Sequence, residues 1–131
     1  MSQVTDVILT VVPGDDDNVA DISFFVASNE PRSDDRGSAP VGPLMPLTGP
    51  VGEQLSGGYK SLGVSLWGAV TNYLDWEKFL ARVEKTPWKS RERVQLLMKE
   101  DGDSYFRLYM FKGGRLANFA PPEPGSWEPR P

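Results

Sequence analysis

The side chains that could carry out chemistry in this chain are mainly carboxylates, because the 131 residues include no histidine and no cysteine. Without histidine, Ser-His-Asp catalysis and histidine acid–base catalysis are excluded. Nearly all zinc and copper sites are excluded as well, because they depend on these two residue types. The sequence therefore predicts no catalytic residue, no metal site and no cofactor.

The densest group of carboxylates is Asp15-Asp16-Asp17, followed by Asn18. Carboxylate oxygens are ligands for Ca²⁺ and Mg²⁺, but adjacent acids without a glutamate at the required offset do not match an EF-hand. We interpret these residues as a solvated hairpin loop, whose charge discourages strand pairing at a sheet edge.

A second group, Glu100, Asp101 and Asp103, could provide paired carboxylates for acid–base or glycosidic chemistry. These residues surround Gly102, however, and an Asp-Gly pair between apolar strands predicts a tight turn. Exposure in such a turn leaves carboxylates without the partners that shift a pKa. We interpret them as turn residues.

Charge is unevenly distributed over a chain whose net charge is −4. From Met1 to Asp35, eight acidic residues against Arg32 alone give −7, which favours a basic protein partner. Four basic residues lie close to Trp88 and could bind a single strand of nucleic acid: Lys85, Lys89, Arg91 and Arg93. The acidic balance of the chain argues against nucleic-acid binding, and we interpret the segment as a solvated connector with Trp88 packed in the core.

Several segments have the patterns of regular structure. Asp75 is a good N-cap for a helix whose apolar residues follow i, i+3, i+4, i+7, and Pro87 ends it. The Asp101-Gly102 turn predicts a hairpin over 93–111. Further strands are expected at 4–12, 20–28, 59–70 and 116–119. For 20–28 a short helix capped at Asp17 or Asn18 is the alternative, but the β-branched and aromatic residues favour a strand.

These elements predict an α+β fold, a mostly antiparallel sheet of about five strands with one main helix packed on one face. We expect a single domain over 1–120 and a Pro-rich tail over 121–131. The helix is expected on the face that carries Val94, Leu96, Phe106 and Leu108. The other face would carry Leu97, Tyr105, Tyr109 and Phe111, and would be covered by a loop or by a second molecule.

A long loop rich in proline and glycine is predicted over 29–58, and loops of this length are often functional. Its second part places Val41, Leu44, Met45 and Leu47 between prolines, which favours an extended conformation. These apolar side chains either pack on the chain's own sheet or bind a partner.

The sequence has no apolar run long enough to span a bilayer and no pattern of a signal peptide, so we expect a cytoplasmic protein without membrane contact. Three functions remain. The first is a non-catalytic protein-binding module, such as a small acidic inhibitor or immunity-type protein, bacterial or from a phage, that blocks a basic partner. The second is a structural or assembly subunit, as in a homo-oligomer or phage particle. The third is a histidine-free enzyme that uses carboxylates.

The first hypothesis is preferred, because small size, an acidic front half and a long loop all suit it. The residues expected to contact a partner are Asp15, Asp16, Asp17, Asp34, Asp35, Leu44, Met45 and Leu47. Replacing the three adjacent aspartates by asparagine is expected to weaken partner binding and leave folding intact.

Overall fold

The structure, a computed structural model, describes residues 4–28, 30–33, 40–47 and 63–119. Its elements are β1 (Val4–Val11), η1 (Pro13–Asp15), α1 (Asp16–Ala27), β2 (Met45–Pro46), β3 (Ser65–Asn72), α3 (Trp76–Lys85), η2 (Arg91–Arg93), β4 (Gln95–Glu100), β5 (Arg107–Lys112) and β6 (Arg115–Asn118). The two η elements are single 3-10 turns that lead into α1 and β4.

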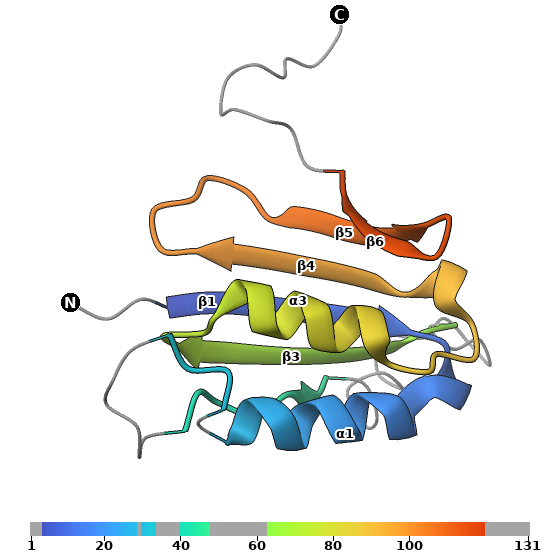
Figure 1. Ribbon diagram of the computed structural model, residues 1–131, viewed down its shortest axis with the longest axis horizontal. Coiled ribbons are helices and arrows are strands. Elements are labelled where there is room, and N and C mark those ends of the chain that lie inside the picture. The colour runs from blue at the N-terminus through green and yellow to red at the C-terminus, as the bar shows by residue number, and fades with distance from the viewer. Residues whose placement is uncertain (1–3, 29, 34–39, 48–62, 120–131) are drawn as a thin grey trace, which may run out of the picture.

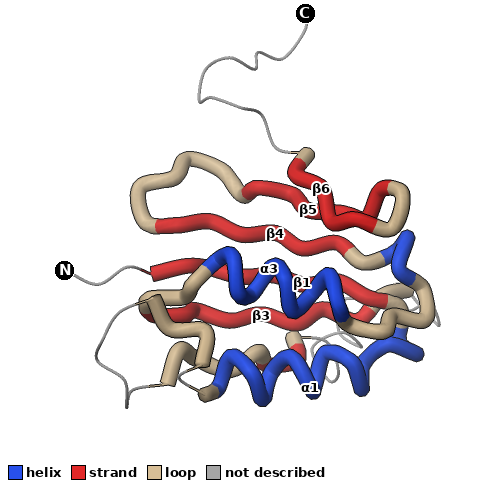
Figure 2. Tube along the Cα trace, in the orientation of Figure 1, coloured by secondary structure: helices blue, strands red, loops and turns tan. Residues whose placement is uncertain are grey.

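Within the described residues the strands form one six-stranded sheet in the order β2-β3-β1-β4-β5-β6, and every neighbouring pair is antiparallel. Helices α1 and α3 lie side by side against one face of this sheet (Figure 1; Figure 2). The predicted α+β class with a mostly antiparallel sheet is therefore confirmed. Strands β1 and β4 form the middle of the sheet.

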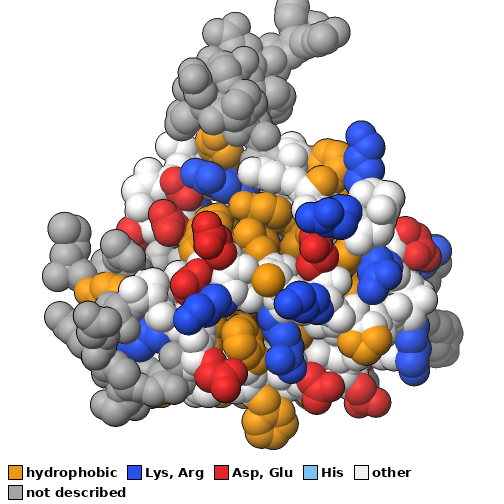
Figure 3. Space-filling view, in the orientation of Figure 1, with side chains coloured by type: hydrophobic (Ala, Val, Ile, Leu, Met, Phe, Trp, Pro, Cys, Tyr) orange, Lys and Arg blue, Asp and Glu red, His pale blue; other side chains and the backbone are white. Residues whose placement is uncertain are grey.

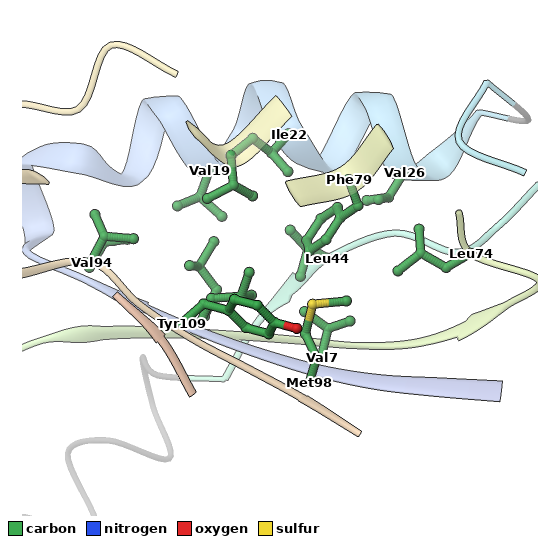
Figure 4. Close-up of a cluster of buried hydrophobic side chains, with 14 of the residues drawn as sticks. Val7, Val19, Ile22, Val26, Leu44, Leu74, Phe79, Val94, Met98 and Tyr109 are labelled. Carbon is green, nitrogen blue, oxygen red and sulfur yellow. The ribbon is translucent and has the colours of Figure 1, made fainter. Parts of the chain in front are cut away.

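The core lies between the helices and the sheet. Along β1 burial alternates, so that Val7, Leu9 and Val11 face the helices while Ile8 lies on the opposite face. Residues of α1, α3 and β4 meet these side chains in one buried cluster (Figure 4), which includes Val19, Ile22, Val26, Phe79, Val83, Val94, Leu96 and Met98. We call the face without helices the outer face.

The strand predicted over 20–28 is wrong, because residues 20–27 belong to helix α1 and Ser28 is its C-cap. Val19, Ile22 and Val26 are buried at the spacing i, i+3, i+7, which is one stripe of a helix. The β-branched and aromatic residues favoured a strand by propensity alone, and packing of the apolar stripe against the sheet overrides that preference.

The prediction of which β5 side chains face the helices is also wrong, because it is shifted by one residue. Leu96 pairs with Tyr109, so Tyr109 points at the helices and is buried, and Leu97 pairs with Leu108 on the outer face. Phe111 likewise packs against the core. A shift of one residue moves every side chain of a strand to the other face. The prediction for Val94 and Leu96 is correct.

The helix predicted after Asp75 is confirmed as α3. The side chain of Asp75 accepts a hydrogen bond from the Lys78 backbone N–H at 3.2 Å, and the helix ends at Lys85, before Pro87. The hairpin of β4 and β5 and the last short strand, β6, are present as predicted. None of the helices in the described ranges is both long and apolar enough to cross a bilayer.

Part of the predicted loop belongs to the folded unit. Val41 and Leu44 are buried, and Met45–Pro46 pairs with β3 as the edge strand β2. The Val41 N–H donates to the carbonyl of Ser28 at 3.2 Å and its carbonyl accepts from Asn72 at 2.9 Å, which ties this segment to α1 and β3. The remainder of the predicted loop, apart from 30–33, and the predicted tail lie outside the described residues.

Candidate functional site

The outward surface of α1 carries an acidic stripe that ends in an aromatic residue. Asp17, Asp21 and Phe24 follow the spacing i, i+4, i+7, which places them on one side of the helix. All three are exposed, and Phe24, at 79%, is the most exposed large apolar side chain of the described chain. We call these three residues the α1 stripe.

Phe24 stands between two shallow hollows. One has a volume of about 230 Å³ and is lined by Ala20, Ser23, Ala27 and Trp67. The other has a volume of about 280 Å³ and is lined by Asp21, Phe25, Ser28, Glu30 and Arg82. A projecting ring between two hollows has the shape of an anchor that inserts into a partner's pocket, and aromatic residues often provide such anchors.

The electrostatic surroundings of Phe24 are acidic on its own helix. Helix α1 contains three aspartates and no lysine or arginine. Figure 3 shows acidic side chains along the lower edge of the molecule, over α1, on both sides of a protruding apolar side chain. One base, Arg82, lines the second hollow and lies over the ring of Phe25 at 5.2 Å from its centroid.

Asp16 belongs to the packing of α1 against the sheet. Its carboxylate accepts hydrogen bonds from the Trp67 indole N–H at 2.9 Å and from the Ser65 hydroxyl at 3.0 Å. These bonds hold the start of α1 at the β3 side of the sheet. Asp16 is half-buried and is a positioning residue for the α1 stripe rather than part of it.

Asp15 is fully buried, so its interpretation as part of a solvated loop is wrong. Its carboxylate accepts from the backbone N–H groups of Lys89 at 2.7 Å and Ser90 at 3.0 Å. It also accepts from the Asn18 side-chain amide at 3.0 Å. Three donors compensate the loss of hydration, as a buried carboxylate requires.

The other predicted contact residues lie in three different places. Leu44 is 1% exposed in the core, and its carbonyl accepts from the Ser23 hydroxyl at 2.7 Å. Met45 and Leu47 are exposed at the β2 edge and line a hollow on the outer face. Asp34 and Asp35 lie outside the described residues. Of the eight predicted residues, the α1 stripe includes only Asp17.

Sequence reasoning missed Asp21 and Phe24, because the segment was interpreted as a strand. In a strand, residues 17, 21 and 24 do not share a face, since successive side chains alternate. The signal that could have found them is the spacing of Val19, Ile22 and Val26, directly after an acidic helix start. Once those three define the buried side of a helix, the α1 stripe follows as its outward side.

Two side chains have shifted pKa values, and both have structural causes. The pKa of Glu84 lies below its usual value because the carboxylate accepts a hydrogen bond from the Leu116 backbone N–H at 2.9 Å, beside Arg115. Burial raises the pKa of Tyr109, which belongs to the core. Neither residue lines the hollows beside the α1 stripe.

Glu100 and Asp101 match their interpretation as exposed turn residues, whereas Asp103 is half-buried and has partners. Glu100 and Asp101 are exposed, and Asp103 accepts from the Glu100 N–H at 3.0 Å and pairs with Arg107 at 3.8 Å. Trp88 is packed in the core and donates its indole N–H to the Val83 carbonyl at 2.8 Å. In the described ranges no cluster of three or more acidic side chains could hold a metal ion.

Comparison with protein-family models, with curated proteins and with solved structures finds no match to this chain. The α1 stripe and its two hollows are therefore interpreted from their own geometry and charge.

Proposed function

We propose that this protein is a non-catalytic protein-binding module, a small acidic inhibitor or immunity-type protein that blocks a basic partner through the α1 stripe. The observation that carries the proposal is Phe24, 79% exposed on an acidic helix between two hollows. A cytoplasmic location remains part of the proposal.

The chemistry of the stripe specifies the partner. Phe24 requires an apolar pocket about the size of one aromatic ring, and Asp17 and Asp21 require lysines or arginines at its rim. Because a carboxylate at the rim of an interface mainly accelerates association, binding should be fast and should weaken as salt rises. The anchor should account for most of the affinity, since a few central aromatic residues dominate such interfaces.

An affinity-capture experiment tests this proposal with a charge-matched control. The wild-type chain, the variant D17K/D21K and the control E92K/E100K are immobilised, and proteins from extracts of the source cells are identified on each. Glu92 and Glu100 are exposed and lie in η2 and β4 rather than in α1, and both variants change the net charge equally. The proposal predicts that the wild type and the control both bind a basic protein. The variant D17K/D21K is predicted to bind this protein at least about tenfold more weakly.

The affinity of the purified partner for the wild type and for both variants is then measured. Equal retention of the captured protein by D17K/D21K and by E92K/E100K would remove the α1 stripe from the interface.

The alternative function, a structural or assembly subunit, is favoured by a different surface, the outer face of the sheet.

A further inference from the structure

The outer face presents side chains in a regular array over its four central strands. Three rows of side chains follow from the registers of β3, β1, β4 and β5. Phe106 is placed in the first row because the Lys99 ammonium lies 5.8 Å from the centre of its ring. Read from β3 to β5, the rows are Val70, Asp6, Lys99, Phe106; Gly68, Ile8, Leu97, Leu108; and Leu66, Thr10, Gln95, Met110.

Polar side chains occupy only the two central strands of this array. Asp6 stands beside Lys99 in one row, and Thr10 donates a hydrogen bond to Gln95 at 3.4 Å in another. The flanking columns on β3 and β5 carry apolar side chains. At Gly68, which has no side chain, Leu47 fills the place, because a Cβ there would lie 2.8 Å from Leu47 Cδ1.

The outer face, which includes this array and the adjoining Met45 and Leu47, is too apolar for a surface that only faces water. Val70 is 72% exposed, Met45 is 57% exposed and Leu47 is 50% exposed. They line a hollow of about 600 Å³ together with Ile8 and Phe106. Contiguous apolar surface of this kind usually marks a binding site for another macromolecule.

We propose that the outer face binds a second copy of this chain about a two-fold axis that runs between β1 and β4, along the strands. Such an axis exchanges the two central columns. Asp6 of each copy then faces Lys99 of the other, and Ile8 faces Leu97. It also sets the apolar β3 column of one copy against the apolar β5 column of the other.

The self-complementary pattern selects a second copy over a partner of one charge. The array contains one acid and one base, so its net charge is zero and it offers no preference for a basic or an acidic surface. Its order across the sheet, apolar, polar, polar, apolar, is the same in both directions. A surface that must match itself about a two-fold axis requires this symmetry.

The size of the face fits a dimer. Six strands about 4.8 Å apart and about six residues long cover roughly 600 Å² per copy. Two such faces bury about 1,200 Å², at the lower end for specific interfaces, and aligned packing of two sheets is a common arrangement. The α1 stripe lies on a helix that covers the opposite face (Figure 1), so the dimer leaves it accessible.

Charge exchange between copies tests the axis directly. The wild-type chain is expected to be a dimer by light scattering at concentrations up to about 100 µM. The variants D6K and K99E each place like charges opposite one another, and each is expected to raise the dissociation constant at least about tenfold. An equimolar mixture of the two variants should form a heterodimer as tight as the wild-type dimer, because opposite charges meet again.

The mixture separates contact between copies from damage to the fold, since a misfolded variant cannot be restored by adding another. D17K makes the same charge change on α1 and is expected to leave the dimer unaffected. A wild-type chain that stays monomeric at these concentrations overturns the proposal. A wild-type dimer that D6K and K99E do not weaken, or that their mixture does not restore, overturns it as well.

Discussion

The buried carboxylate of Asp15 accepts a hydrogen bond from the backbone N–H of Lys89 at 2.7 Å, across 74 positions of the chain. Through this bond, and a second one from the Ser90 N–H, the start of α1 is fastened to the segment between α3 and β4. The three adjacent aspartates therefore have three different surroundings. Asp15 holds the fold, Asp16 positions α1 against β3, and Asp17 faces the solvent.

Replacing Asp15 by alanine is expected to lower the free energy of unfolding by about 2–3 kcal/mol, because it leaves the backbone N–H groups of Lys89 and Ser90, in a partly buried site, without their acceptor. D17A, at an exposed position, is expected to change it by no more than about 0.5 kcal/mol. Urea denaturation of both variants measures the difference. Equal midpoints for D15A and D17A would mean that the bonds of Asp15 contribute nothing to stability. In that case the replacement of Asp15, Asp16 and Asp17 by asparagine would leave folding intact, although the burial of Asp15 indicates that it should destabilise the fold.

Gly42 is expected to be indispensable to the packing of residues 40–44. It has a φ of +132°, a conformation that residues with a Cβ rarely adopt, and an added Cβ would lie 3.0 Å from the Val70 carbonyl oxygen. We expect G42A to destabilise the fold by about 1–3 kcal/mol. G14A is the control, because a Cβ there meets nothing within 4 Å. If thermal unfolding finds G42A as stable as G14A, this segment does not pack on the sheet.

The contact of Glu84 with β6 predicts a dependence of stability on pH. Its folded-state pKa lies below the usual 4.5, chiefly because it accepts the Leu116 N–H; desolvation opposes the shift and Arg115 adds to it. The stabilisation is therefore fully present above pH 4.5 and is lost as pH falls through the lowered pKa. E84Q should be less stable than the wild type at about pH 7, and the difference should close in acid.

Unfolding curves of E84Q and of E92Q over this pH range test the prediction. Glu92 is exposed, so E92Q should follow the wild type at every pH. A constant difference between E84Q and the wild type from neutral to acid pH would show that the Glu84 charge does not stabilise the contact with β6.

The parts of the fold that the sequence predicts well are those with local signals. Helix α3 has an N-cap at Asp75 and a stop at Pro87, and the β4–β5 hairpin has the Asp101-Gly102 turn. Helix α1 has a weaker local signal, the spacing of Val19, Ile22 and Val26 after an acidic start. Aromatic and β-branched residues in the same segment oppose this signal, because they favour strands by propensity. Whether this segment forms a helix or a strand therefore depends on the tertiary packing of Val19 and Ile22.

The candidate site depends on these less predictable features. The sequence indicates an acidic segment, but only the helical spacing brings Asp17, Asp21 and Phe24 together. The pairing of β4 with β5 is predictable from the turn, whereas its register is not, because several residues separate the strands. A slip of one residue then moved Leu108 and Tyr109 to the wrong faces.

A photo-cross-linking amino acid placed at Phe24, and in a second preparation at Phe119, tests the central claim most directly. Both phenylalanines are exposed, at 79% and 50%, and the probe replaces one aromatic ring by another. In extracts of the source cells, the probe at position 24 is predicted to form an adduct with a basic protein. The yield of this adduct should decrease as the salt concentration is raised, and the probe at position 119 should not form the adduct. No adduct at position 24, or the same protein captured equally from both positions, would contradict a partner site on the α1 stripe.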